Sequence, residues 1–250
     1  FLAMIREVDG TDMSQYDIDI DYLEDLVNLY NETYNEEVEF YEGNRVNPNQ
    51  FFGIYKWNSA QERFDKTNSS DRFEMHLPAK PENASNLNIV LSVDNFSEKA
   101  GKIDSEEYYF PESFRVRATY DGKLIAGITL SDFSVDPSGA SSLPISFLME
   151  VETPPYVNTF SISRRSARDY TITMNIESDG ACKYALSVNG KSNTDTYEDF
   201  DPEVNLESVS GTLQISQVVY TFSANTKNID WEGDLSVNEL NREISVSVKK

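Results

Sequence analysis

Alternation of apolar and polar residues predicts two β-hairpins in the second half of the chain. In the first, residues 114–128, apolar positions alternate on both sides of an Asp-Gly pair. Each of the two strands carries one apolar set. With a two-residue loop, the two sets would lie on different faces of the hairpin. With a three-residue loop, residues 120–122, both sets lie on the same face. The two sets are Phe114, Val116 and Ala118, and Leu124, Ala126 and Ile128. We therefore predict a three-residue loop with Gly122 at positive φ.

The second hairpin, residues 170–188, repeats this construction around residues 178–180. The apolar set Ile172, Met174 and Ile176 faces the set Cys182, Tyr184 and Leu186. The two hairpins together predict an antiparallel sheet with one buried face. Cys182 is the only cysteine, so the chain holds no internal disulfide, and its place in this pattern predicts a small core residue.

Further strands are predicted along most of the chain. Before residue 100 they are residues 37–41, 51–57, 72–77 and 87–93; after it they are residues 143–151, a shorter strand near Phe160 and Ile162, residues 209–224 and residues 235–248. The alternation changes phase between Ile215 and Val218, which predicts a bulge or turn at Ser216 and Gln217.

Residues 1–35 are predicted to be helical. Apolar residues recur at steps of three and four, and acidic residues crowd the start, where negative charge suits the helix dipole. The predicted fold class is mainly β: an antiparallel, twisted or curled sheet, sandwich or half-barrel-like, with an N-terminal helix.

We expect residues 1–250 to form one domain, with a helical segment at 1–35 and antiparallel β structure at 36–250. The polar stretch at 97–111 is predicted to be a long loop, and it is the place where a domain boundary would fall. It ends at the aromatic residues Tyr108, Tyr109 and Phe110, which a loop would use as an anchor.

The charge balance argues against two classes of partner. The 250 residues hold 43 acidic and 21 basic side chains, a formal net charge of −22. Such a surface repels phosphate backbones and anionic lipid headgroups, so we expect neither nucleic-acid binding nor electrostatic membrane docking. The chain begins at Phe1 without Met, from which we expect that a signal peptide or a lipid-modified cysteine precedes it.

The sequence lacks the residues that most common catalytic sites require. His76 is the only histidine and lies opposite the apolar positions of its strand, which predicts a surface residue rather than a catalytic base. The glycine patterns that hold phosphates are absent. We expect no catalytic residue, no metal and no cofactor. Glycoside hydrolysis by two carboxylates stays open, because many are present and none is singled out.

Two acidic clusters were considered as calcium sites. Residues 17–21 open like an EF-hand loop, but Tyr22 stands where that loop needs Gly and Asn28 where it needs Glu. An acidic helix start is the preferred interpretation. For the second cluster, residues 195–203, a solvated loop is preferred over a calcium ligand set.

Tyr55, Trp57 and Trp231 are the candidate ligand-binding residues. Each lies beside Asn, Asp or Lys, and exposed aromatic rings among such residues can stack on sugar rings. The alternative is an aromatic lid over the core, with its polar atom at the surface.

Three segments resemble secreted lipoproteins of unknown function from Bacteroidetes. They are residues 53–58 (GIYKWN), residues 73–78 (FEMHLP) followed by 86–89 (NLNI), and residues 120–126 (YDGKLIA). These segments fall within residues 53–126, about a third of the chain. The resemblance implies export, with a lipid anchor at the outer membrane or in the periplasm.

We therefore expect a non-catalytic cell-envelope lipoprotein that binds a glycan or an apolar ligand. The alternatives are a two-carboxylate glycoside hydrolase and a structural surface subunit.

Overall fold

The computed structural model describes residues 16–34, 51–103, 106–135, 144–166, 168–193, 206–225 and 244–249. These contain the helix α2 (Ile20–Tyr34), the 3-10 turn η2 (Pro81–Asn83) and thirteen strands. The first six strands are β1 (Gly53–Asn58), β2 (Arg63–Thr67), β3 (Arg72–Leu77), β4 (Ile89–Ile103), β5 (Glu106–Tyr120) and β6 (Lys123–Val135). The others are β7 (Pro144–Thr153), β8 (Tyr156–Arg164), β9 (Asp169–Ser178), β10 (Ala181–Ser192), β11 (Leu206–Ile215), β12 (Val218–Asn225) and β13 (Ile244–Lys249).

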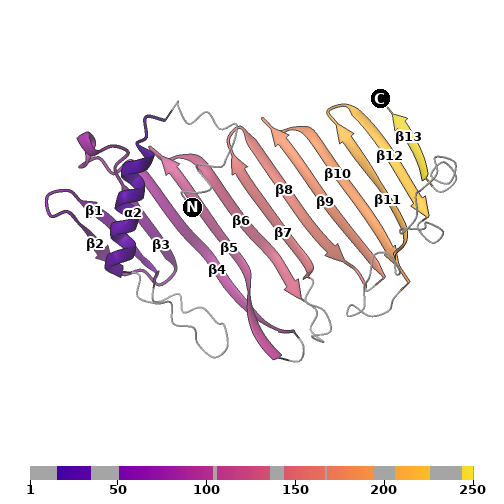
Figure 1. Ribbon diagram of the computed structural model, residues 1–250, viewed down its shortest axis with the longest axis horizontal. Coiled ribbons are helices and arrows are strands. Elements are labelled where there is room, and N and C mark those ends of the chain that lie inside the picture. The colour runs from indigo at the N-terminus through magenta and orange to yellow at the C-terminus, as the bar shows by residue number, and fades with distance from the viewer. Residues whose placement is uncertain are drawn as a thin grey trace. The chain divides into compact units, whose positions relative to one another are not determined.

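Hydrogen bonds join the strands into one sheet. From β3 to β13 each strand lies beside the next strand of the chain, while β1 lies between β3 and the edge strand β2. β1 runs parallel to β3 and antiparallel to β2. The prediction of a mainly β, antiparallel fold with an N-terminal helix is confirmed (Figure 1).

The chain divides into two compact units. Unit 1 consists of residues 1–98, 111–130 and 151–155, and unit 2 consists of residues 99–110, 131–150 and 156–250. The loop predicted at 97–111 is wrong, because β4 continues to Ile103 and β5 begins at Glu106. A polar stretch can be a strand when its polar side chains pair across the ladder, as Ser97 and Ser113 do through their hydroxyl oxygens at 2.8 Å.

In unit 1 the helix α2 covers one face of the sheet. The carboxylate of Asp19 accepts a hydrogen bond from the Tyr22 N–H at 3.0 Å and so caps the first turn. The ring of Tyr30 meets the ring of Tyr55 edge to face, with centroids 4.9 Å apart. The predicted helix is confirmed over Ile20–Tyr34. Residues 1–15 and the strand predicted at 37–41 lie outside the described residues.

The buried apolar side chains among the described residues all belong to unit 1. They are Leu23, Leu26, Tyr30, Phe52, Tyr55, Phe64, Met75, Leu77, Ala79, Ile89, Leu91, Ala118, Ile125, Ala126 and Leu130. The core therefore lies between α2 and the first strands, where a second layer excludes water from the sheet.

In unit 2 the alternation continues, but the described side chains of this unit form no such core. Most side chains of β8 to β10 are half-buried, and Met174 is 38% exposed. The buried face predicted for the second hairpin is therefore wrong. The reason is physical: a period of two shows that a strand has an apolar and a polar face, but it does not supply a layer to cover the apolar one.

Both Asp-Gly turns are two-residue loops, so the predicted three-residue loops are wrong. Tyr120 pairs with Lys123 across the first turn, and Ser178 pairs with Ala181 across the second. Asp121 and Gly122 have φ values of 48° and 74°, the positive pair that a type I′ turn requires. The positive φ predicted for Gly122 is confirmed.

In each hairpin, a bulge brings the apolar residues of the two strands back onto the same face, which a two-residue loop alone would not do. Ala118 pairs with Ala126 and Thr119 with Leu124, which leaves Ile125 as one extra residue on β6. Lys183 is the extra residue on β10. The apolar sets beyond each bulge share a face as predicted.

Cys182 precedes the second bulge, and its predicted place among the core residues is therefore wrong. It pairs with Glu177, on the face opposite Leu186, and is half-buried. The turn predicted at Ser216 and Gln217 is confirmed. The Ser216 N–H donates to the carbonyl of Lys183 at 3.0 Å, so the bulge on β10 holds the next turn in place.

Candidate binding site

Of the three residues predicted to bind a sugar, the structure describes Tyr55 and Trp57, both on β1. Tyr55 has an exposed fraction of 0% and contacts Tyr30, so its ring cannot stack on a ligand. This corrects the prediction for Tyr55. Trp57 is half-buried, packs against the core and meets Phe64 with ring centroids 5.4 Å apart, as the lid interpretation expects of the ring. Its indole nitrogen is buried, however, and does not lie at the surface as that interpretation requires. Trp231 lies outside the described residues.

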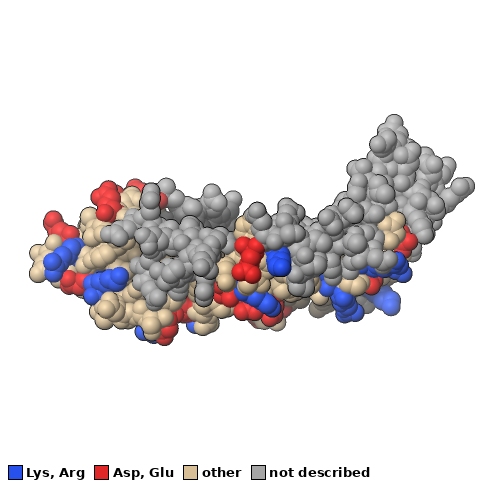
Figure 2. All heavy atoms as spheres, turned by 90° about the horizontal axis from the view of Figure 1, so that it is seen from below, with Lys and Arg blue, Asp and Glu red and all other residues tan. Residues whose placement is uncertain are grey.

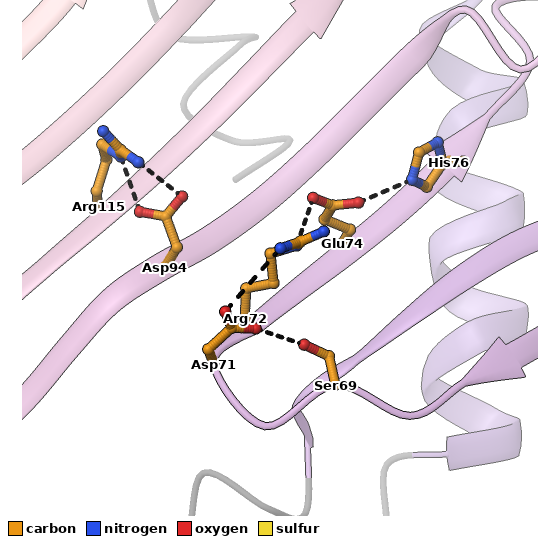
Figure 3. Close-up of polar contacts among 7 residues, drawn as sticks. All are labelled: Ser69, Asp71, Arg72, Glu74, His76, Asp94 and Arg115. Carbon is orange, nitrogen blue, oxygen red and sulfur yellow. Dashed lines mark hydrogen bonds and ion pairs between the residues drawn. The ribbon is translucent and has the colours of Figure 1, made fainter.

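His76 lies in a row of polar side chains on β3 (Figure 3). Its Nε2 lies 3.1 Å from Glu74 Oε2, and the other carboxylate oxygen of Glu74 lies 2.8 Å from Arg72 Nε. The predicted face of His76 is confirmed, because Met75 and Leu77 are buried on the other side. Arg72, through an ion pair, and His76, through a hydrogen bond, thus share one carboxylate along the strand.

The same side of unit 1 carries a second ion pair. Arg115 donates to both carboxylate oxygens of Asp94, from Nε at 2.8 Å and from a terminal nitrogen at 2.9 Å. These hydrogen bonds raise the pKa of Arg115. On the side seen in Figure 2, the described acidic side chains lie among basic ones. These charged side chains of unit 1 are therefore paired with one another.

The acidic start of α2 is structural. Asp19 caps the helix, and Asp17 forms an ion pair with Lys80 that raises the pKa of the Lys80 ammonium. With Asp21 these side chains line an open depression. No group of three metal-ligating side chains occurs within the described ranges. The second candidate calcium cluster, residues 195–203, falls outside them.

An apolar cavity of about 240 Å³ lies in unit 2, on strands β4 to β7. Its lining consists of Lys99, Ala100, Gly101, Phe110, Phe133, Ser134, Val135 and Ile145. No carboxylate is among these residues. Lys99 is the only charged group of the lining, and it is exposed.

Close packing around a glycine shapes the cavity. A Cβ on Gly101 would lie 2.4 Å from Cγ2 of Val135 and 3.1 Å from Cε2 of Phe110. Phe110 stacks on Phe133, with centroids 5.9 Å apart and planes inclined by 29°. Any other residue at Gly101 would push these side chains into the space, so the glycine keeps the cavity open.

The cavity can hold an apolar group, and Lys99 in its lining can pair with an anionic group of the same ligand. Sequence reasoning missed it because residues 99–101 and Phe110 were assigned to a loop. The available signal was the aromatic run before Pro111, which was interpreted as an anchor. Phe110 instead lies in β5 and forms one wall.

Comparisons with known proteins add no relative: no family model, curated protein or solved structure matches the chain. Within the described residues, no helix is long and apolar enough to cross a membrane.

Proposed function

We propose that this protein is a non-catalytic, lipid-anchored cell-envelope protein that binds the acyl chain of an anionic amphiphile. The observation that carries the binding function is the apolar cavity beside Lys99 in unit 2. A glycan needs several polar partners beside an aromatic face, whereas this lining is mostly apolar. The apolar ligand is therefore favoured over the glycan.

Cavity size restricts the ligand. A cavity of about 150 Å³ can bind benzene, while pockets for drug-sized ligands begin at about 300 Å³. The present cavity, about 240 Å³, lies between these values. It suits part of one acyl chain rather than a whole lipid. Each buried CH2 contributes about 0.8 kcal/mol, so chain length should control affinity until the cavity is filled.

Lys99 supplies the preference for an anionic head. Lys99 lines the cavity and is exposed, and an ion pair with an exposed lysine is worth up to about 1 kcal/mol. A carboxylate ligand should therefore bind up to about fivefold more tightly than the matching alcohol. Lys99→Gln should remove this difference.

Calorimetric titration with octanoate, decanoate and decanol, all below their micelle concentrations, tests the proposal. Affinity should rise about fourfold for each added CH2. Ile145→Asn places a polar group in the lining and should weaken decanoate binding by at least about tenfold.

Leu148→Asn is the matched control, because Leu148 lies three residues further along β7 and therefore faces the other side. It should leave the affinity within about twofold. Equal losses in both variants, or no binding at millimolar decanoate, would remove the cavity as the site.

The envelope location depends on the resemblance to Bacteroidetes lipoproteins. Sequencing the gene upstream of the codon for Phe1 tests it. We expect a hydrophobic leader that ends in a small residue and a cysteine. A start codon directly before Phe1 would contradict both export and the anchor.

A structural surface subunit is the second candidate. It is favoured by the position of β2 and β13 at the two ends of the strand order, where each has one neighbour among the described strands. Unpaired edges are sites for pairing with another chain. This candidate predicts assembly without ligand and no response to chain length in the titration.

A further inference from the structure

The strand register of unit 2 sorts its side chains into two unlike faces. One row of cross-strand partners runs across six strands as Phe160, Met174, Leu186, Leu213, Tyr220 and Val248. The row beside it, on the other face, is Ser161, Thr173, Ser187, Thr212, Thr221 and Ser247. The hydroxyl groups of Ser161 and Thr173 lie 2.5 Å apart. One face is thus apolar and the other is hydroxylated.

Two further rows extend the apolar face. They are Ile162, Ile172, Val188, Gly211 and Phe222, and Asn158, Ile176, Tyr184, Ile215 and Val218. We call these three rows the apolar face of unit 2. None of its positions holds Asp, Glu, Lys or Arg.

The exposed large apolar side chains of the described residues all lie on this side of the sheet. Met174 is 38% exposed, Ile215 48% and Val248 59%. Tyr156, 44% exposed, lies two residues before Asn158 on β8 and so faces the same way. A soluble protein rarely leaves such residues grouped in contact with water, which indicates an interaction surface.

We propose that the apolar face of unit 2 is a dimer interface, and that its partner is the same face of a second copy of this chain. Sheets pack face to face about 10 Å apart through alternating apolar side chains, and this face has that composition. A two-fold axis makes one patch its own partner, so no further surface is required.

The area agrees with a dimer. Six strands about 4.8 Å apart and three rows of about 6.7 Å each give about 600 Å² per copy, or about 1,200 Å² in total. Stable interfaces begin at about this size. Phe147 on β7 extends the surface, because its ring lies 5.3 Å from that of Phe160.

Charge agrees as well. Each chain carries a formal net charge of −22, but the apolar face contributes none of it. Two copies can meet there without burying a charge, while their remaining charges repel one another over a longer range. Salt screens that repulsion, so the dimer should be tighter at 0.5 M than at 0.05 M salt, the reverse of a charge-driven interface.

Sedimentation velocity of the whole chain over about 1–100 µM tests the inference. We expect a monomer–dimer equilibrium in this range. Met174→Glu with Ile215→Glu places two charges on each copy within the interface and should weaken the dimer by at least about 100-fold. Thr212→Glu with Thr221→Glu adds the same charge on the hydroxylated face and should change it by less than about threefold.

Far-UV circular dichroism checks that the variants remain folded. If the glutamate pair does not fold, Met174→Ser with Ile215→Ser should shift the equilibrium in the same direction by about tenfold. Ligand binding at the cavity plays no part in this measurement, so the dimer and the acyl-chain proposal can fail separately.

Several results would overturn the dimer. They are a wild-type monomer at 100 µM, equal effects of the two glutamate pairs, and weaker association at high salt. A monomer whose Met174 is protected from oxidation would assign the face to another segment of the same chain. A monomer that floats with neutral phosphatidylcholine vesicles would assign it to a lipid surface.

Discussion

Unit 1 and unit 2 use the same kind of alternating strand but stabilise it differently. In unit 1, α2 lies on the sheet and completes a core in which Leu77 and Tyr55 have an exposed fraction of 0% (Figure 1). In unit 2, no apolar side chain of the described residues reaches that burial. Its strands depend on their neighbours within the sheet. Alternation therefore predicts a strand with one apolar face. Whether that face becomes part of a core depends on another element, such as α2, that packs against it.

Among the described residues of unit 2, aromatic rings packed over glycines are one way in which the sheet buries its own surface. A Cβ on Gly190 would lie 1.9 Å from Cζ of its cross-strand partner Tyr170, and one on Gly211 would lie 2.7 Å from Cζ of its partner Phe222. The Tyr170 ring fills the space of the side chain absent at Gly190, whereas at Gly211 the carbonyl oxygen of Ser187 lies nearer than the Phe222 ring. Burial raises the pKa of Tyr170, while nearby Arg164 acts in the opposite direction.

The largest difference between the units should appear when a leucine is truncated in each. Leu77→Ala removes a fully buried side chain from unit 1 and should lower the free energy of unfolding by about 2–5 kcal/mol. Leu186→Ala removes a half-buried one from unit 2 and should cost about 1 kcal/mol. Urea denaturation measures both, with hydrogen exchange to locate the change.

Both substitutions should be made in the Met174→Glu, Ile215→Glu background, so that association does not bury Leu186. Equal losses in that background would mean that unit 2 has a covered core after all, and the contrast between the units would be wrong.

A smaller effect should follow from filling a glycine of unit 2. Gly190→Ala forces the Tyr170 ring away and should cost about 1–3 kcal/mol. In the Tyr170→Ala background the same substitution should cost under about 1 kcal/mol, because the space is then free. A double-mutant cycle by urea denaturation gives the coupling. A coupling near zero would show that the ring does not stabilise the sheet through the glycine.

Gly122→Ala is the matched control. Nothing lies within 4 Å of a Cβ at Gly122, but its φ of 74° strains any other residue. It should cost about 1 kcal/mol whatever residue stands at position 170.

Local pattern was sufficient for much of the fold. The helix over Ile20–Tyr34, the strand Arg72–Leu77, the turn at Ser216 and Gln217, and the positive φ of Gly122 follow from residues close in the chain. The bulges at Ile125 and Lys183 did not, since a three-residue loop and a two-residue loop with a bulge align the strands equally well. For the same reason, Cys182 was predicted on the wrong face of its strand.

The candidate site was harder to predict, because its residues are joined by the sheet rather than by the sequence. Gly101, Phe110, Phe133 and Ile145 come from four strands. A polar strand such as the end of β4 has the composition of a loop, and only its hydrogen bonds distinguish the two. For Tyr55 the error has the opposite sense. Its polar neighbours in the sequence predicted an exposed ring, but alternation along β1 directs the ring toward the core.

The last prediction concerns pH and tests the aromatic packing of unit 1. Burial raises the pKa of Tyr30, and the neighbouring Tyr55 raises it further. A group whose pKa is higher in the folded state stabilises the fold fully below its unfolded pKa of about 10 and loses this contribution as pH rises above it. Stability should therefore fall above pH 10, by about 1.4 kcal/mol per pH unit for each such tyrosine.

Tyr30→Phe should reduce that slope. Urea midpoints at pH 9, 10 and 11 measure the slope. If Tyr30→Phe leaves the slope unchanged, the ring ionises as readily in the folded chain as in the unfolded one. The tight aromatic packing that distinguishes unit 1 would then not exist in solution.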